Sequence, residues 1–212
     1  MTKRGLLVVI SGFAGSGKGT ICKELMRLHD QYAFSVSATT RDKRPGEVDG
    51  KDYFFITKER FEEMIANDEL LEYAQYVSNF YGTPRKYVEE QLKQGKDVIL
   101  EIECQGALHV KEIFPEAVLF FVMPPTVREI YNRLKKRGTE TEEVIMKRMR
   151  RGQEEAEAID RYDYLLVNDD LDETVQLLHE TVCCARNAVE RNAAFLSEIK
   201  SEFVSFFEEQ KL

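Results

Sequence analysis

The sequence predicts an α/β protein with a parallel sheet flanked by helices. Four short β-rich runs occupy residues 6–11, 97–103, 117–123 and 164–168. All four are nearly continuous in apolar residues, as expected for strands that are buried on both faces. Helical patterns separate them, and this alternation is typical of a parallel sheet with crossover helices. A glycine-rich stretch follows the first run directly.

That stretch, "GFAGSGKGT", has the spacing Gly-x4-Gly-Lys, and a helical pattern from Lys18 to Leu28 follows it. Between a strand and a helix, such a loop turns successive backbone N–H groups toward a polyphosphate, and the lysine reaches the β and γ oxygens. The alternative is a flexible turn that happens to carry a lysine, which the buried strand and the helix disfavour. The predicted phosphate-binding residues are Gly12, Phe13, Ala14, Gly15, Ser16, Gly17, Lys18, Gly19 and Thr20.

A bound Mg²⁺ ion is predicted with the polyphosphate, although Gly19 stands where a hydroxyl normally contacts the metal. Thr20 lies about 100° further round the helix and does not simply replace that ligand. Glu101 and Glu103 are two apart on a predicted strand, so they should share a face at its carboxyl end. We predict that Thr20 and the two carboxylates hold Mg²⁺ through water. An ion pair between these acids and arginines of the insertions is the alternative.

Two stretches interrupt the strand–helix alternation. Residues 35–83 are polar and aromatic with short strand-like pieces, and residues 127–158 are basic and then acidic with few core candidates. We interpret both as insertions over a nucleotide crevice. Pro84 suits the first position of a helix that should run to about Gln94 and end at Gly95.

Composition limits the remaining classes of protein. The 212 residues suffice for one domain, and 43% hydrophobic with 32% charged residues is ordinary for a globular protein. The formal charge of −8 argues against general nucleic-acid binding. The apolar runs are too short to span a membrane, and the N-terminus is a poor signal peptide. Four cysteines without paired spacing favour a reduced, cytoplasmic compartment.

Several stretches together resemble the guanylate kinase family. They are "GFAGSGKGT", "FSVSATTRDKRPGEVDGKDY", "LLEYAQYVSNFYGTP", "LEIECQG", "RLKKRGTETEE" and "VNDDLDE", and they cover roughly residues 6–190 in the family's order. The resemblance implies a P-loop kinase fold that moves the γ-phosphoryl of ATP to GMP, and to dGMP, in purine metabolism and GTP supply. It also implies that residues 35–83 bind GMP and that residues 127–158 are a mobile lid on a core of 1–34, 84–126 and 159–190.

The resemblance assigns roles to single residues on the acceptor side. It implies that Glu72 recognises guanine, since a carboxylate accepts from guanine N1–H and the exocyclic amine, a donor pair that adenine lacks. Arginine forks suit a phosphate, and tyrosine hydroxyls add neutral donors. Without the resemblance, Arg41 and Arg44 would be interpreted as part of a solvated face, and the tyrosines as core residues. The residues implied for GMP are Ser37, Arg41, Arg44, Tyr53, Glu72, Tyr81, Thr83, Glu101 and Glu103.

On the ATP side the resemblance places Arg137 and Arg148 around the transferred phosphoryl. Arg133 lies one helical turn before Arg137, and we predict that it flanks the adenine. Asn168 is implied as an adenine contact, although Asn-Asp is also common turn chemistry. The predicted catalytic residues are Lys18, Arg41, Arg137 and Arg148. Without the resemblance, the basic stretch would be a solvated helix with acid pairs. No histidine is expected to be catalytic.

Two departures from the family pattern concern the metal, because Gly19 replaces a serine and Glu103 replaces an aspartate. We expect a small shift in metal position. Two other functions stay open: a catalytically inactive scaffold, which the intact loop disfavours, and a kinase for another monophosphate, which Glu72 disfavours.

The chain after residue 172 carries a heptad-like pattern. Its apolar positions are Val175, Leu178, Val182, Ala185, Val189, Leu196, Ile199, Phe203 and Phe206. The first half should pack on the kinase unit of residues 1–190. For the helical extension 191–212 two alternatives remain, self-association as a homo-oligomer or folding back on its own chain.

Overall fold

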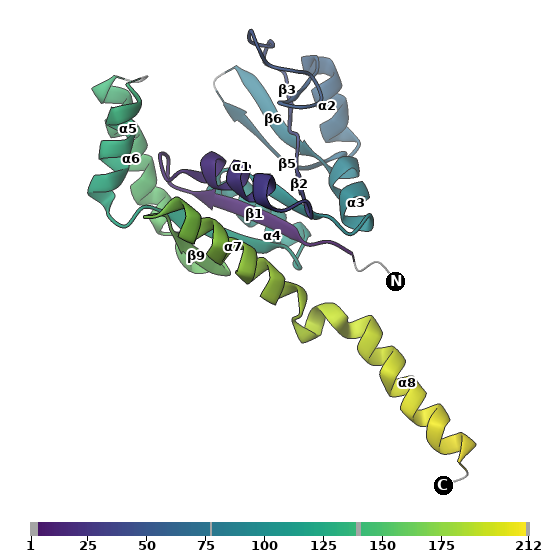
Figure 1. The fold of residues 1–212 in the computed structure, drawn as a ribbon. Coiled ribbons are helices and arrows are strands. Elements are labelled where there is room, and N and C mark those ends of the chain that lie inside the picture. The colour runs from purple at the N-terminus through teal and green to yellow at the C-terminus, as the bar shows by residue number, and fades with distance from the viewer. Residues whose placement is uncertain (1–3, 77, 139–140, 211–212) are drawn as a thin grey trace.

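The computed structural model describes residues 4–76, 78–138 and 141–210, and its core is a five-stranded sheet (Figure 1). The strand order is β2-β7-β1-β8-β9, and all neighbouring pairs are parallel. The strands are β1 (Leu7–Gly12), β2 (Tyr32–Phe34), β7 (Asp97–Glu101), β8 (Val118–Met123) and β9 (Tyr164–Val167). The predicted parallel sheet is confirmed.

The outer strands depart from the prediction. β9 was expected to be buried on both faces, which is wrong, since Tyr164, Leu165 and Val167 are exposed. β9 has only β8 beside it, so it forms an edge of the sheet. β2 escapes sequence-based prediction because its three residues are too few to show a periodicity.

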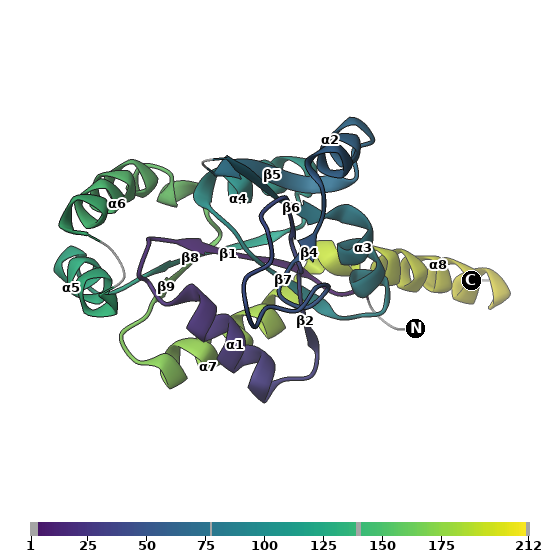
Figure 2. The same cartoon turned by 90° about the horizontal axis from the view of Figure 1, so that it is seen from above.

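Helices cover both faces of the sheet (Figure 2). Along β1, Val8 and Ile10 pack in one core with α1 (Lys18–Leu28) and α7 (Leu171–Arg186). The alternate side chains pack in a second core with α3 (Arg85–Lys93) and α4 (Cys104–Ile113). Full burial of each such aliphatic side chain contributes about 1.5–3 kcal/mol. Pro84 is the N-cap of α3 rather than its first helical residue, one position from the prediction.

Within the predicted insertion 35–83 the chain builds a second sheet of order β4-β3-β6-β5. Its elements are β3 (Ala38–Thr39), β4 (Phe54–Phe55), α2 (Lys58–Ala66), β5 (Leu70–Tyr76) and β6 (Asn79–Pro84). Phe61 and Met64 of α2 pack with Ala38 and Leu70 in a small core of their own. The second sheet therefore has its own support, separate from the cores of the first sheet.

The basic stretch forms two helices, α5 (Val127–Arg137) and α6 (Glu142–Ala156), followed by the short η1 (Ile159–Arg161). Thr126 and Thr141 cap them, each side chain accepting from the backbone N–H three residues on. Residues 139 and 140 of the predicted lid lie outside the described residues. The few buried positions of this stretch, Ile130, Leu134 and Ile145, pack in one cluster with Phe13.

The predicted packing of the first half of the tail is confirmed, because Val175, Leu178, Val182 and Ala185 of α7 are buried against β1. Asp97, fully buried at the start of β7, anchors the end of α7 by accepting from Arg186 at 2.7 Å.

The prediction of one continuous heptad pattern from Val175 to Phe206 is wrong. α7 ends at Arg186, the short η2 (Val189–Asn192) follows, and α8 (Ala193–Glu209) begins a new helix. Val189 lies past the end of α7 and is 72% exposed. Figure 1 shows α8 pointing away from the rest of the chain, so the structure does not fold it back. Residues 211–212 of the predicted extension lie outside the described residues. Among the residues that the structure describes, no helix is long and apolar enough to cross a bilayer.

Two histidines stack where α1 ends against α7, and we expect them to make stability pH-dependent. The rings of His29 and His179 lie 3.6 Å apart and nearly parallel, and the Tyr32 hydroxyl is 2.9 Å from His179 Nδ1. Burial, and then the neighbouring His29, lower the pKa of His179 from 6.5. The unfolded chain therefore binds protons more readily, so this stability is complete above pH 6.5 and is lost as the pH falls through the lower folded pKa.

His179→Gln should accordingly show a shallower fall in thermal midpoint between pH 7 and pH 5 than the unmodified protein. His109→Gln, an exposed histidine on α4, is the matched control and should keep the original slope. Equal slopes for all three proteins in melting curves would contradict the prediction.

Candidate active site

The loop Gly12–Thr20 joins β1 to α1 at the carboxyl end of the sheet. Gly15 and Gly17 have φ angles of 80° and 93°, in the left-handed region that favours glycine. Lys18 Nζ donates to the main-chain oxygens of Gly12 at 2.8 Å and Phe13 at 3.1 Å. The ammonium group therefore lies across the loop, beside the N-terminus of α1, where an anion is stabilised.

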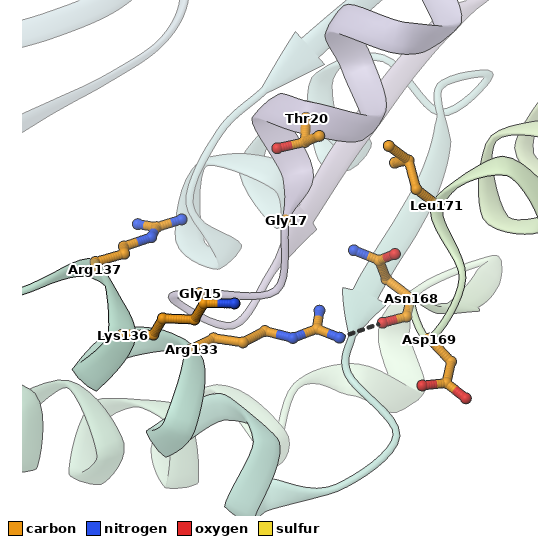
Figure 3. Close-up of a pocket in the computed structure, with 9 residues that line it drawn as sticks. All are labelled: Gly15, Gly17, Thr20, Arg133, Lys136, Arg137, Asn168, Asp169 and Leu171. Atoms are coloured by element: carbon orange, nitrogen blue, oxygen red, sulfur yellow. Dashed lines mark hydrogen bonds between the residues drawn. The ribbon is translucent and has the colours of Figure 1, made fainter.

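A pocket of about 350 Å³ opens beside the loop (Figure 3). Its walls come from the loop and α1, from the end of α5 and from the turn after β9. They consist of Gly15, Gly17, Thr20, Arg133, Lys136, Arg137, Asn168, Asp169 and Leu171. The structure thus brings together residues predicted separately for the ATP side. It adds Lys136, which nothing in the sequence distinguishes from the other cations of α5.

Most of the other predicted loop residues lie on the side of the loop that faces the protein core. Phe13 is buried with its ring 4.9 Å from that of Phe121, and Ala14 packs against the same cluster. The Ser16 side chain is fully buried. Gly19 lies in the first turn of α1, and a Cβ there would be 3.4 Å from a Glu101 carboxylate oxygen. These side chains therefore fix the shape of the loop by packing, and its main chain stays available to contact a ligand.

Glu101 and Glu103 do not share a strand face, so that prediction is wrong. β7 ends at Glu101, and Glu103 is the N-cap position of α4. The chain turns between them, and the Glu103 carboxylate accepts from Arg151 of α6 at 2.9 Å. For Glu103 the structure therefore shows the alternative, an ion pair with an arginine of the basic stretch. Burial raises the pKa of Glu101, while the charges of Lys18 and Arg137 lower it.

The second sheet gathers most of the residues predicted for the GMP phosphate. The Arg41 guanidinium lies 5.4 Å from the centre of the Tyr53 ring, and the Tyr53 and Tyr81 rings are 6.0 Å apart. Arg41 donates to both carboxylate oxygens of Glu47, at 2.7 and 3.0 Å. The Arg44 backbone N–H also donates to Glu47, at 2.7 Å.

Sequence reasoning missed Glu47 as a member of this cluster. Hydrogen bonds from the Arg41 side chain, and then from the Arg44 backbone, lower the pKa of Glu47 to about 2. The Glu47 carboxylate thus holds the Arg41 guanidinium in a bidentate, charge-assisted pair. The signal available was its position inside "RPGEVDG", three residues after Arg44.

Glu72, the residue predicted to recognise guanine, lies on β5 and is only 8% exposed. The hydroxyl of Thr83 on β6 donates to Glu72 Oε1 at 2.6 Å. Burial raises the pKa of Glu72, and this hydroxyl opposes the rise. Ser37, just before β3, is half-buried, and its main-chain oxygen accepts from Phe54 at 2.9 Å. Glu72 and Thr83 thus form one polar pair.

Gly106 on α4 leaves room for that pair, which the sequence did not reveal. A Cβ at Gly106 would lie 3.1 Å from Glu72 Oε2. Gly106→Ala should therefore displace the Glu72 carboxylate while favouring the helix itself. An overpacking cost of about 1–3 kcal/mol corresponds to a KM for GMP raised about 5- to 150-fold. The KM for ATP should stay unchanged, and the better helix propensity of alanine should offset part of the packing cost in the melting temperature.

Steady-state kinetics with each substrate varied in turn measure this effect. Gly152→Ala on α6 is the matched control, because its Cβ would meet Phe13 at an ordinary 3.5 Å. An unchanged KM for GMP in Gly106→Ala would show that the carboxylate tolerates the methyl group.

Two further predicted residues come from the helices over the loop. Arg137 is the last residue of α5 and lines the pocket, whereas Arg148 lies on α6, half-buried and outside the pocket's lining. The Arg133 side chain donates a hydrogen bond to the main-chain oxygen of Asn168, as Figure 3 shows. The structure therefore brings Arg133, Arg137 and Asn168 to the loop, whereas Arg148 lies on the next helix, α6.

A loop that binds a polyphosphate serves hydrolases and kinases alike, and the second sheet distinguishes the two. Its Tyr53 lies close enough to Glu101 for that carboxylate to help raise the tyrosine's pKa, and Glu101 in turn adjoins the start of α1. The second sheet thus carries an arginine and a buried carboxylate, groups that suit a phosphate-bearing acceptor. The fold and the site together define a P-loop kinase.

Comparisons with known proteins identify the kind of kinase. The family model described as "Guanylate kinase" matches residues 4–184. A guanylate kinase of Caldanaerobacter subterraneus subsp. tengcongensis is 48% identical over 202 residues, 95% of this chain and 98% of its own. One from Clostridioides difficile is 52% identical over 189 residues, 89% and 92% of the two chains. The crystal structure of guanylate kinase from Anaplasma phagocytophilum superposes with a TM-score of 0.71 at 31% identity, covering 90% of each chain.

The chain belongs to the guanylate kinase family of nucleoside monophosphate kinases.

Proposed function

We propose that this enzyme transfers the γ-phosphoryl group of ATP to GMP, with dGMP as a further acceptor, giving ADP and the diphosphate. The observation that carries the proposal is the buried Glu72–Thr83 pair in the second sheet, a fixed hydrogen-bond acceptor for a base with adjacent N–H donors. The polyphosphate loop at the carboxyl end of β1 supplies the matching donor site. On this proposal, residues 35–83 bind GMP, residues 127–158 act as a lid, and the reaction serves purine nucleotide metabolism and GTP supply.

The mechanism follows from position and charge. Main-chain amides of the loop and Lys18 hold the ATP phosphates, while Arg41, Arg44, Tyr53 and Tyr81 hold the GMP phosphate. Arg137 brings positive charge to the oxygens of the moving phosphoryl group. Phosphoryl transfer of this kind needs alignment and charge stabilisation more than a strong base. Glu47 releases Arg41 when the GMP phosphate takes its place.

The residues present fit a Mg²⁺ ion that keeps most of its waters. The Glu101 carboxylate lies beside Gly19 at the start of α1, and Thr20 lines the pocket. Among the described residues no group of three histidine, cysteine or acidic side chains could hold a metal by itself. Such a donor set suits Mg²⁺ bound chiefly by phosphate oxygens and water. Glu101 and Thr20 would hold it from the protein side, and its charge would offset that of the phosphates.

Nucleotide specificity tests the proposal against its alternatives. We expect ADP release from ATP and Mg²⁺ with GMP, and far less with AMP, CMP or UMP, in a coupled assay. Activity on another monophosphate instead would reassign the base site. No activity with any of them, while the protein still melts cooperatively, would favour a scaffold. EDTA should stop the reaction, which measures the metal requirement directly.

We further propose that α8 joins two copies of this chain. Exposed apolar residues, among them Phe195, Phe203 and Phe206, lie along a helix that makes few contacts with the rest of the chain. A surface helix with this much exposed apolar area gains stability by packing against a partner. Light scattering on a chain stopped after Arg191 should give half the mass of the full chain. Equal masses would contradict self-association.

The cytoplasm is the compartment that we propose, supported by Cys22, Cys104, Cys183 and Cys184, which are all free thiols.

A further inference from the structure

Asn168, predicted as an adenine contact, hydrogen-bonds to the phosphate-binding loop. It follows β9 directly, and its backbone N–H donates to Met123 at 2.8 Å, which keeps it in register beside β8. The side chain is almost completely buried, and its amide Nδ2 donates to the main-chain oxygen of Ser16 at 2.7 Å. The amide of Asn168 therefore contacts the main chain of the loop directly.

The loop is shaped to receive that amide. A Cβ on Gly17 would lie only 2.4 Å from Asn168 Nδ2, and Gly17 has a φ of 93°. Gly17 is therefore needed for close approach of the Asn168 side chain as well as for its backbone conformation. Figure 3 shows Asn168 beside the loop that carries Gly15 and Gly17, on the side away from the end of α5, with the Arg133 side chain extending to its main-chain oxygen.

The hydrogen bond fixes the direction of one peptide group. In a trans peptide the C=O of Ser16 and the N–H of Gly17 point to opposite sides of the chain. A donor that holds the Ser16 oxygen from outside the loop therefore turns the Gly17 N–H inward, where a phosphate would bind. Without that donor the carbonyl is free to turn inward, and its negative end repels an anion.

The same residue also connects the loop to α5. The main-chain oxygen of Asn168 accepts from Arg133 Nη2 at 3.0 Å, and Arg133 Nε donates to Glu129 at 2.8 Å. Arg133 lines the pocket one turn before Arg137 on the same helix. Movement of α5 is thus transmitted to Asn168, and through its amide to the Ser16–Gly17 peptide.

Resting on the proposed function, we infer that Asn168 is a positioning residue, which orients the Gly17 N–H toward the ATP phosphates and links that orientation to α5 through Arg133. It acts on the polyphosphate through the loop rather than through the adenine. The inference has a direct consequence, because the effect of losing the amide should follow the phosphates and not the base.

Asn168→Leu tests this, since it has a similar shape but donates no hydrogen bond to the Ser16 carbonyl and adds no charge beside the phosphates. Leaving a buried acceptor unpaired corresponds to a KM for ATP raised about 5- to 150-fold, with the KM for GMP unchanged. Asn187→Leu is the matched control, because that amide also donates to a main-chain oxygen, of Cys183 at 3.1 Å, on the far end of α7. Melting curves establish that each variant is folded.

Binding of inorganic tripolyphosphate and of adenosine, each measured by calorimetry, separates the two roles. We expect Asn168→Leu to weaken tripolyphosphate by the same factor as ATP and to leave adenosine unchanged. Weakened adenosine with unchanged tripolyphosphate would overturn the inference in favour of a base contact. Tripolyphosphate binding needs no acceptor, so this measurement stands even if the enzyme does not phosphorylate GMP.

The link to α5 is tested by Arg133→Met alone and combined with Asn168→Leu. If Arg133 acts through Asn168, the double variant should lose less tripolyphosphate affinity than the product of the two single losses. Multiplicative losses would overturn the link.

Discussion

Glu72→Leu is expected to abolish phosphorylation of GMP while leaving the protein folded. The leucine fills a similar volume but accepts no hydrogen bond, so the guanine N–H donors would be buried without partners. A site built on such bonds discriminates by about 10⁴–10⁵, and we expect kcat/KM for GMP to fall by about that factor. Measured kcat/KM for GMP, with ATP saturating, gives the effect.

The same variant should melt at an unchanged or higher temperature. The structure keeps the Glu72 carboxylate buried at a cost, as its raised pKa indicates. Removing a buried ionisable group relieves that cost, although the Thr83 hydroxyl loses its acceptor. A loss of activity with no loss of stability would identify Glu72 as a functional rather than a structural residue.

Glu69→Leu is the matched control for this substitution. Glu69 lies just before β5 in the same insertion, but its carboxylate accepts from Arg60 at 2.6 Å on an exposed surface. It should keep its activity toward GMP. If Glu72→Leu also retains kcat/KM within tenfold, guanine recognition lies elsewhere.

Acid should reproduce part of the effect in the unmodified enzyme. Because burial raises the pKa of Glu72, the carboxyl gains its proton at a higher pH than an ordinary glutamate. The protonated group has lost part of its acceptor capacity, so the KM for GMP should rise as the pH falls through that raised pKa. The KM for GMP in Glu69→Leu should rise in the same way.

Arg137→Ala is expected to lower kcat by about 10³–10⁵, the worth of a cationic finger on a transferring phosphoryl group. Arg137 ends α5, lines the pocket and is close enough to Glu101 to lower its pKa. The variant should bind GMP normally, because no acceptor residue changes. Single-turnover kinetics separate the chemical step from product release.

Lys135→Ala provides the control for general loss of positive charge. Lys135 is on the same helix, but its ammonium lies over the Tyr131 ring at 5.6 Å, and it is not among the residues that line the pocket. Its kcat should change little. If the two variants behave alike, Arg137 contributes only to the overall field of the helix.

The sequence predicted the local features of the site well. The loop could be predicted because the spacing of its glycines and lysine, the buried strand before it and the helix after it are all local properties of the sequence. The parallel sheet follows from the apolar runs and their separation by helices. The edge position of β9 and the short β2 were not predictable in this way, because they depend on which strand neighbours which.

Long-range contacts account for what the sequence did not reveal. Glu47 beside Arg41 and Gly106 beside Glu72 combine residues that gain meaning only from their partners. The break between α7 and α8 was equally hidden, because the apolar spacing continues through it. Glu103 was misread since the end of β7 is set by the geometry of the sheet and not by residue type.

The sequence by itself thus determined the parallel sheet and the phosphate-binding loop, because motif spacing and apolar periodicity are local properties of the chain, and its resemblance to a known family indicated the kind of kinase. Only the tertiary structure decided that Glu103 pairs with Arg151 and that Asn168 holds the Ser16 carbonyl. Hydrogen bonds and ion pairs between segments up to 152 residues apart depend on how the elements pack, and packing is a property of the whole chain.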